Sequence, residues 1–247
     1  MTTVQKPIIM TIDGAVMKLQ INRPQEQNGL NWEALELLAD AYQRAIDDKT
    51  LRVIVITGNH EYFHTGGRVN VSNAGEQKKY SAGIERMQRL QDELTIPMIA
   101  AVSGDCLKGG MGLLADADIA VARRGVHFGF PEVRMGGVPM MVMASTISIP
   151  KKRALEAYYS SEYFDADEAF RMGLVNCVAS DEEFWDTVQH YIDMIVSKPR
   201  ELIEMTRAAY YRMIEMPGKK ERKNYAMDIL ENHVLTTMAS GKTEYNI

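Results

Sequence analysis

The pair Gly109–Gly110 has the clearest chemical meaning in this sequence. It follows the apolar run Ile96–Val102, which predicts a buried strand, and it precedes the helix-like segment Met111–Ala115. Glycines at the entrance of a helix leave backbone N–H groups free, and free N–H groups at one point suit an oxyanion. The alternative interpretation is a tight turn in which the glycines only allow a positive φ.

A second pair, Gly66–Gly67, favours the first interpretation. It lies in the segment FHTGG that begins at Phe63, downstream of the β-branched run Arg52–Thr57. Two glycine pairs that follow separate strands allow N–H donors from different loops to converge on one carbonyl oxygen. We therefore expect an oxyanion hole.

Four motifs follow one another in an order that is typical of a known family. NRPQEQNGL begins at Asn22, FHTGG at Phe63, SGDCLKGG at Ser103 and PEVRMGGVP at Pro131. Together they resemble the crotonase superfamily of enoyl-CoA hydratases and isomerases, and the resemblance covers nearly all of the chain. It implies an α/β fold in which residues 1–190 form a crotonase-like core, a spiral of β-β-α turns. Residues 191–247 would be a C-terminal helical region of the same domain, used for trimer packing and for covering the active site.

The resemblance also implies what the glycines do. The N–H groups of Gly67 and Gly109 would bind the carbonyl oxygen of an acyl thioester, with Gly66 and Gly110 beside them in the substrate site. Such a site stabilises the enolate that forms when a group leaves or adds at the neighbouring carbon atoms. The substrate would be an acyl-CoA or acyl-carrier-protein thioester, and no cofactor is expected beyond the CoA of the substrate.

Glu132 is the candidate acid/base. Hydratases of the family use two glutamates; this sequence has Gly112 in place of the first, whereas the second is present as Glu132. One carboxylate can move one proton between two carbon atoms, so the resemblance implies an isomerase or a hydratase with a single acid/base. The alternative for Glu132 is a solvent-exposed glutamate on a helix.

Three further positions in the motifs bear on the substrate. Arg68 stands where the family often has aspartate, and it would contact CoA phosphates or a substrate carboxylate, or else lie in solvent. Met140 stands where the hydratases have glycine, which would narrow the acyl end of the pocket. His64 lies inside the oxyanion motif and would line the thioester site.

A narrower resemblance offers a second enzymatic interpretation. The segments YFHTGG, KKYS, SIPKK and ILENHVLTT resemble the decarboxylase branch that acts on glutaconyl groups in polyketide β-branching. That resemblance implies that Lys79 binds a carboxylate and that His233 donates a proton, whereas members of that branch usually lack Glu132. A third interpretation, suggested by Gly112 and Arg68, is a non-catalytic member that binds acyl-CoA or a partner protein.

Composition and charge argue against several classes of function. The chain has 247 residues, of which 46% are hydrophobic, enough for one substantial core. The net charge of −5 and the lack of a basic stripe argue against a nucleic-acid partner. The apolar runs are shorter than a membrane span, and the N-terminal segment lacks the apolar stretch of a signal peptide. With two cysteines and no metal-ligand spacing, we expect a cytoplasmic protein without disulfides, membrane contact or a catalytic metal.

Patterns in the first half of the chain predict the elements around the motifs. Residues 8–22 alternate as a strand pair around Asp13–Gly14, and Asn31 is the expected N-cap of the next helix. Strands at 52–57, 98–102 and 119–122, separated by helices or glycine loops, indicate βαβ-type winding. The polar residues 71–93 predict a mobile loop that leads into a helix.

The second half predicts mostly helix. From Lys151 onward the pattern is helical, and Asp165 with Glu168 has the spacing of a capping box. Further helices are expected over 181–197, 199–216 and near 223–238. Their apolar positions, together with the resemblance, predict a homotrimer or a dimer of trimers.

Overall fold

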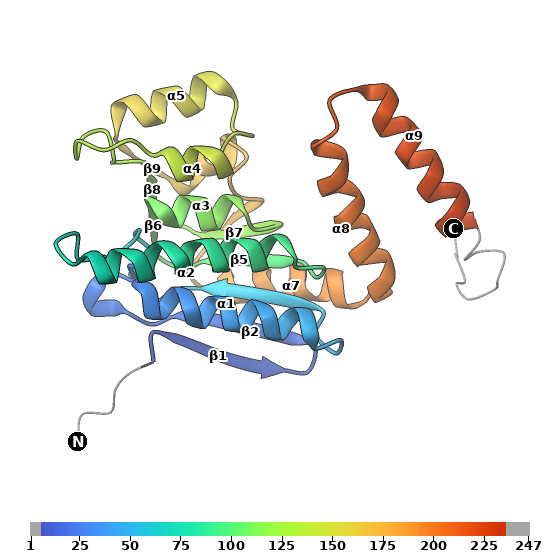
Figure 1. Ribbon diagram of the computed structural model, residues 1–247, viewed down its shortest axis with the longest axis horizontal. Coiled ribbons are helices and arrows are strands. Elements are labelled where there is room, and N and C mark those ends of the chain that lie inside the picture. Colours follow the sequence, from blue (N-terminus) through green and yellow to red (C-terminus); the bar gives the residue numbers. More distant parts are fainter. Residues whose placement is uncertain (1–5, 236–247) are drawn as a thin grey trace. The chain divides into compact units, whose positions relative to one another are not determined.

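The computed structural model describes residues 6–235, which form two compact units (Figure 1). Unit 1 comprises residues 1–200 and unit 2 residues 201–247. Among the described residues, no helix is both long enough and apolar enough to cross a membrane.

Within residues 6–235, the first sheet of unit 1 has six strands. In spatial order they are β1 (Ile8–Asp13), β2 (Val16–Ile21), β3 (Val53–Thr57), β5 (Met98–Val102), β7 (Ile119–Arg123) and β10 (Cys177–Ala179). The first two form the predicted antiparallel pair, and all the later neighbours pair in parallel. Every residue of β3 and β5 is buried, which explains why these strands are continuous apolar runs in the sequence.

The second sheet is made of strands that are too short for the alternation of apolar and polar residues to reveal them in the sequence. Its spatial order is β4 (Tyr62–His64), β6 (Asp105–Leu107), β8 (His127–Gly129) and β9 (Tyr163–Asp165). The first three pair in parallel, and β9 runs antiparallel to β8. The carboxyl ends of β4, β6 and β8 therefore lie along one edge of this sheet.

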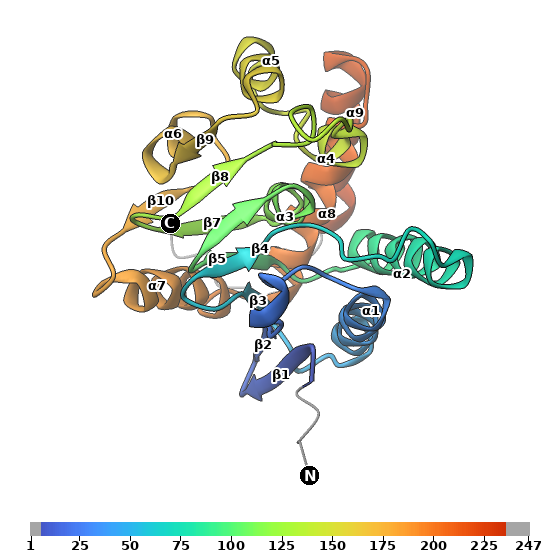
Figure 2. The same ribbon diagram turned by 90° about the vertical axis from the view of Figure 1, so that its left-hand side faces the viewer.

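The two sheets are linked by a repeated path of the chain. A strand of the first sheet leads into a strand of the second and then into a helix, as in β3, β4 and α2 (Ala74–Asp92), and again in β5, β6 and α3 (Gly109–Ala115). The chain next passes from β7 to β8 and, after a loop, to α4 (Met140–Ser145). This path is the predicted spiral of β-β-α turns, so the expected fold class is confirmed (Figure 2).

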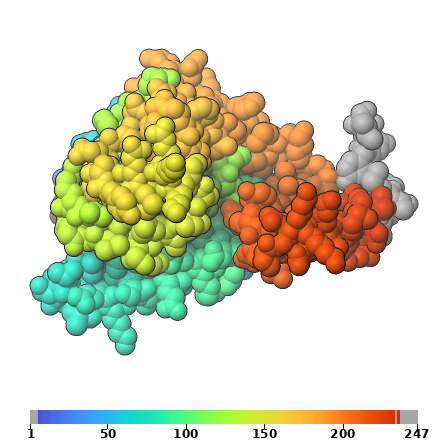
Figure 3. Space-filling model, turned by 90° about the horizontal axis from the view of Figure 1, so that it is seen from above, coloured from blue at the N-terminus to red at the C-terminus, as the bar shows by residue number. Residues whose placement is uncertain are grey.

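Helices complete unit 1. They are η1 (Pro24–Glu26), α1 (Trp32–Asp47), α5 (Lys151–Ser160), α6 (Ala166–Arg171) and α7 (Phe184–Val196). The first α-helix begins where predicted, because the Asn31 side chain accepts a hydrogen bond of 3.0 Å from the backbone N–H of Ala34. Likewise, the Asp165 carboxylate caps α6 by accepting from Glu168 N–H at 2.8 Å. Figure 3 looks onto α5 (yellow), with the α2 segment (teal) along the edge of unit 1.

Two of the predicted segments differ from the structure. The polar region 71–93 was predicted as a mobile loop leading into a helix that ends before Pro97, and the helix takes up nearly all of it. Helix α2 begins at Ala74, after an N-cap from Asn73, and ends at Asp92. Its long polar surface hides the helical period, because only Gly83, Leu90 and Gln91 of this helix are buried. The second half is not purely helical either, because β9 and β10 interrupt it. Strands of three residues are too short to show an alternating pattern.

Unit 2 consists of helices near the predicted positions. It contains most of α8 (Arg200–Ile214), together with α9 (Lys219–Ile229) and a π-helical turn, η2 (Leu230–Leu235). None of the side chains described between 201 and 235 is buried. Unit 2 therefore has no apolar core within the described residues.

Candidate active site

Three neighbouring strand ends position the candidate site. The chain leaves β4 through Thr65 to Gly67, leaves β6 through Lys108 to Gly109, and leaves β8 through Phe130 to Glu132. Because these strands pair in parallel, the segments that follow them emerge at the same edge of the sheet. Residues more than 60 positions apart in the sequence are brought together in this way.

The two glycine N–H groups lie close to each other. A Cβ atom added to Gly109 would lie 3.9 Å from the backbone nitrogen of Gly67 and 3.4 Å from the Cα of Gly66. Leu30 pairs with this segment through the Gly66 carbonyl and the Arg68 N–H, which leaves the Gly67 N–H outside the pairing. Among the described residues, neither the Gly67 nor the Gly109 N–H has a hydrogen-bond acceptor.

Close contacts surround two of these glycines, Gly110 against backbone and Gly67 against the end of a side chain. A Cβ on Gly110 would lie 2.0 Å from the carbonyl oxygen of His64, so α3 could not approach β4. A Cβ on Gly67 would lie 1.9 Å from the hydroxyl oxygen of Tyr80. The Tyr80 hydroxyl is therefore held against the backbone of Gly67, at the rim of the candidate oxyanion hole.

Lys108 adopts a backbone conformation that favours glycine. Its φ is 54° and its ψ is −126°, in the region of the first central residue of a type II′ turn. The strained turn directs the chain from β6 into α3, of which Gly109 is the first residue. The Lys108 side chain packs over Gly66, where an added Cβ would lie 2.9 Å from the lysine Cβ.

Glu132 lies half-buried in the turn after β8. Its Oε2 atom is buried and has no hydrogen-bond partner among the described residues. Burial raises the pKa of the Glu132 carboxyl, while a backbone hydrogen bond and the Lys108 charge oppose the rise. A carboxylate with a raised pKa and a free oxygen has the properties of a general base.

His64 is fully buried beside the glycines. Its Nδ1 lies 3.0 Å from the Asn28 carbonyl oxygen, and its Nε2 lies 3.7 Å from the position of a Cβ on Gly109. Desolvation lowers the pKa of His64 to about 4, so the ring is neutral at neutral pH. A neutral ring with Nδ1–H donating to Asn28 leaves Nε2 as an acceptor.

A cavity of about 400 Å³ connects these groups. The residues predicted for the site that line it are His64, Gly67, Gly109, Glu132 and Met140. The apolar part of its lining includes Leu35, Ile84, Met87, Leu113, Val138 and Val142. An apolar cavity with a few convergent polar groups is the usual form of a small-molecule site.

Comparison with known proteins identifies the family. The model of the enoyl-CoA hydratase/isomerase family matches residues 11–243. The chain belongs to this family. It is 31% identical over 210 residues to the crotonyl-CoA hydratase of Syntrophomonas wolfei subsp. wolfei, covering 82% of this chain and 80% of that protein. It is also 27% identical over 229 residues to the carnitinyl-CoA dehydratase of Salmonella agona, covering 91% and 87%.

Solved structures agree with this assignment. The enoyl-CoA hydratase of Mycobacterium smegmatis superposes with a TM-score of 0.84 at 26% identity, over 98% of this chain and 93% of that one. A Thermobifida fusca YX protein solved in complex with CoA has the same fold, with a TM-score of 0.83 at 21% identity and 95% of each chain covered. Family and relatives together show that the chain is a crotonase-family enzyme.

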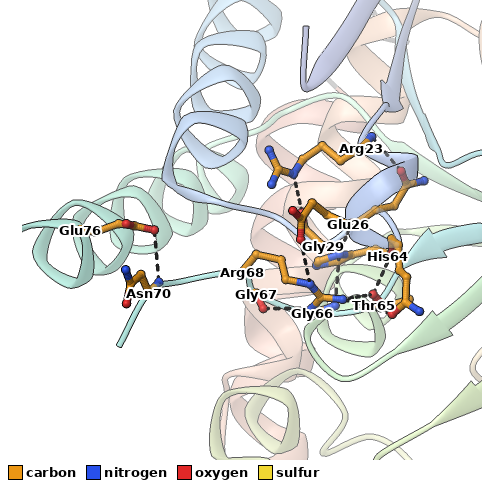
Figure 4. A network of polar contacts seen from close by, with 12 residues as sticks. Arg23, Glu26, Gly29, His64, Thr65, Gly66, Gly67, Arg68, Asn70 and Glu76 are labelled. Carbon is orange, nitrogen blue, oxygen red and sulfur yellow. Dashed lines mark hydrogen bonds and ion pairs between the residues drawn. The ribbon is translucent and has the colours of Figure 1, made fainter. Parts of the chain in front are cut away.

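In this enoyl-CoA hydratase/isomerase family member, Arg68 does not line the cavity. Figure 4 shows it within a network of polar contacts that includes Glu26 and Thr65. Its guanidinium donates to the Thr65 hydroxyl at 3.2 Å and to the Gly67 carbonyl at 3.2 Å, and it lies 3.7 Å from the Glu26 carboxylate. Its side chain also packs on Gly29. Arg68 therefore fastens the loop after β4 to the η1 segment.

Other predicted residues also lie outside the lining of the cavity. Gly66 and Gly110 are buried behind it, and the Lys79 ammonium lies 4.5 Å above the ring of Trp32 on exposed α2. His233 falls in η2, and its side chain is outside the described part of the structure. Lys79 alone of the decarboxylase pair can therefore be placed, outside the lining of the cavity, and its pairing with His233 stays a prediction.

Six polar residues of the lining were not found from the sequence. They are Tyr80, Gln88, Gln91, Lys108, Asp116 and Ser145. The sequence carries a signal for Lys108, because it interrupts a glycine motif in which the family has glycine. The other five lie in helices or at helix ends, where neither motif nor spacing shows which face meets the cavity.

Proposed function

We propose that this protein acts on an enoyl-CoA thioester bound in the cavity. The thioester oxygen accepts hydrogen bonds from the N–H groups of Gly67 and Gly109, and Glu132 transfers the proton. The observation that carries the proposal is the convergence of two acceptor-free N–H groups and one unpartnered carboxylate oxygen on one cavity. An oxyanion-hole donor typically contributes about 3–4 kcal/mol to stabilising the transition state.

Double-bond isomerisation needs one base. In a 3-enoyl thioester, the Glu132 carboxylate removes a proton from C2, and the electron pair passes into a dienolate whose negative charge lies on the thioester oxygen. The protonated Glu132 then returns the proton to C4, so that the double bond moves to C2–C3. Atoms and charge balance without a cofactor other than the CoA of the substrate.

The residue at position 112 favours isomerisation over hydration. Gly112 has no side chain, and a Cβ there would meet the Ser145 hydroxyl at 3.7 Å, so no carboxylate faces Glu132 from this turn of α3. Hydration by two glutamates is therefore not available. Hydration with Glu132 as single acid/base is the second candidate, supported by the names of the relatives.

A panel of CoA esters followed by mass spectrometry tests the proposal. Isomerisation of 3-hexenoyl-CoA leaves the mass unchanged and creates the absorbance of a conjugated thioester, whereas hydration of 2-hexenoyl-CoA adds one water. Loss of carbon dioxide from glutaconyl-CoA would transfer the assignment to decarboxylation. If no ester of the panel changes, the proposed function is wrong.

A further inference from the structure

The cavity has a second polar region that the proposed reaction does not use. Asp116, Ser145 and Gln91 contribute to its lining, among apolar side chains such as Met87 and Leu113. They come from the C-terminal end of α3, the end of α4 and the last turn of α2.

Asp116 lies beyond the reacting atoms. It follows Gly112 by four residues and therefore occupies the same face of the α3 segment. It follows Gly109 by seven residues, which corresponds to roughly 10 Å along the helix axis. Its carboxylate therefore faces a part of the acyl chain several carbon atoms beyond the thioester.

The Asp116 carboxylate has no cationic partner. Among the ion pairs of the described residues none includes Asp116, and the charged group that acts on it is the Asp92 carboxylate, which repels it. Burial raises the pKa of Asp116 to about 6, and a hydrogen bond from the Ser145 hydroxyl opposes the rise. The nearby phenol of Tyr42 points its hydroxyl at the Met98 sulfur, so it does not pair with this carboxylate.

Gln91 is a buried polar residue beside Asp116 in the lining, and its amide group lacks a partner. The residue is 6% exposed, and its Nε2 is buried without a hydrogen-bond acceptor among the described residues. An unsatisfied buried amide costs about 1–3 kcal/mol, so a ligand that supplies an acceptor is favoured at this point. The cavity therefore offers a bound group an acceptor on Asp116 and a donor on Gln91.

We propose that this region, formed by Asp116, Ser145 and Gln91, binds a hydroxyl group carried by the acyl chain. The hydroxyl donates its proton to the Asp116 carboxylate and accepts a hydrogen bond from Gln91 Nε2. The preferred substrate is then a hydroxyacyl thioester rather than a plain alkyl one. This inference rests on the proposed function, because it assumes an acyl thioester in the cavity.

Other substituents satisfy the region less well. An alkyl end leaves Gln91 Nε2 without an acceptor and the Asp116 carboxylate with only the Ser145 hydroxyl, and a carboxylate is repelled by Asp116. An ammonium group would pair with Asp116, but it has no lone pair for Gln91, and its own desolvation is costly. A hydroxyl satisfies both groups without bringing a second charge into the cavity.

Binding of unreactive esters tests the inference separately from turnover. Isothermal calorimetry compares 5-hydroxypentanoyl-CoA and 6-hydroxyhexanoyl-CoA with pentanoyl-CoA and hexanoyl-CoA. We expect the wild type to bind one of the hydroxy esters about tenfold or more tightly than its alkyl counterpart, since one hydrogen bond to a charged group contributes about that much. In Asp116→Leu the preference should disappear, whereas Asp92→Asn, at a residue outside the lining, should keep it.

The binding results distinguish a failure of the hydroxyl site from a failure of the proposed function. Equal binding of hydroxy and alkyl esters, or an unchanged preference in Asp116→Leu, overturns the inference while leaving the proposed function standing if 3-hexenoyl-CoA is still isomerised. Tighter binding of 6-aminohexanoyl-CoA than of 6-hydroxyhexanoyl-CoA overturns the hydroxyl assignment in favour of a cation. No binding of any CoA ester overturns both proposals. Circular dichroism of Asp116→Leu confirms that a lost preference is not a lost fold.

Discussion

At the scale of single residues, Glu132 combines two properties that a proton carrier needs. Its Oε2 is buried without a partner, and burial raises its pKa. We expect Glu132→Gln to lower kcat by about 10²–10⁴-fold, because the amide cannot accept the proton, while ester binding stays nearly unchanged. As the pH is lowered, the wild-type rate should begin to fall at a higher pH than it would with an ordinary glutamate as the base. The reason is that the raised pKa of Glu132 causes its carboxylate to be protonated at that higher pH. Steady-state kinetics measured across a range of pH check the drop in kcat and the position of the acidic limb. If Glu132→Gln turns over substrate as fast as the wild type, Glu132 is not the acid/base.

Lys108 affects the same carboxylate through its charge and the backbone through its strain. Lys108→Gly removes a positive charge, so the pKa of Glu132 should rise and the acidic limb of the pH–rate profile should move to higher pH. The same change should stabilise the protein by about 1 kcal/mol, because glycine accepts φ 54° without strain.

Lys108→Met is the matched control for these two effects. It removes the charge and keeps a Cβ in the strained conformation, so it should shift the pH profile without raising the unfolding free energy. A stability gain in the Met variant would show that strain is not the cause.

The raised pKa of Asp116 makes the stability of the folded protein depend on pH. Its pKa is raised from 3.8 to about 6, so between these values the folded protein binds more protons than the unfolded chain, and stability falls as pH rises. Asp116→Asn should therefore gain roughly 2–3 kcal/mol over the wild type at pH 8 and little at pH 4. Urea unfolding of the wild type and of Asp116→Asn at pH 8 and pH 4 measures the difference in unfolding free energy. If the substitution had the same effect at both pH values, its cause would be the packing of the new side chain and not the loss of the charge.

At the scale of elements, the contact between α3 and β4 determines where the oxyanion donors lie. Gly110→Ala places a Cβ 2.0 Å from the backbone oxygen of His64, so the helix must move away from the strand. We expect Gly110→Ala to lower the free energy of unfolding by several kcal/mol, because the clash is between backbone segments that cannot move apart without disturbing the helix or the strand. Gly112→Ala, in the same helix, meets its nearest atom at 3.7 Å and should be neutral or stabilising by up to about 1 kcal/mol. Thermal unfolding of both variants tests the contrast.

The elements also explain how much could be predicted from the sequence. The glycine pairs were found because they follow apolar runs such as 98–102, and Glu132 was found through the family motif that begins at Pro131. The strands β4, β6 and β8 that directly precede them are too short to show a pattern of their own. Tyr80 and Gln91 were not found because α2 presents few buried residues, so its sequence does not show which face meets the cavity. Asp116 was missed because it became a cavity residue only through the position of α3 against α2 and α4.

At the scale of the whole molecule, the predicted homotrimer or dimer of trimers remains to be tested. None of the side chains described in residues 201–235 is buried, although several are large and apolar: Tyr210, Ile214, Met227, Leu230 and Leu235. A helical unit without a core of its own is not stable in isolation, so these side chains require a further surface.

We expect burial between copies of the chain to provide that surface. Light scattering coupled to size exclusion should give three or six times the 27.8 kDa of one chain at micromolar concentration. Tyr210→Glu with Ile214→Glu should shift the mass towards the monomer, because two charges would then have to be buried at the contact. Lys219→Glu, a charge change at the start of α9 among exposed polar residues, is the control and should leave the mass unchanged. A wild-type mass of one chain, or an unchanged assembly in the double variant, would show that unit 2 does not join the copies.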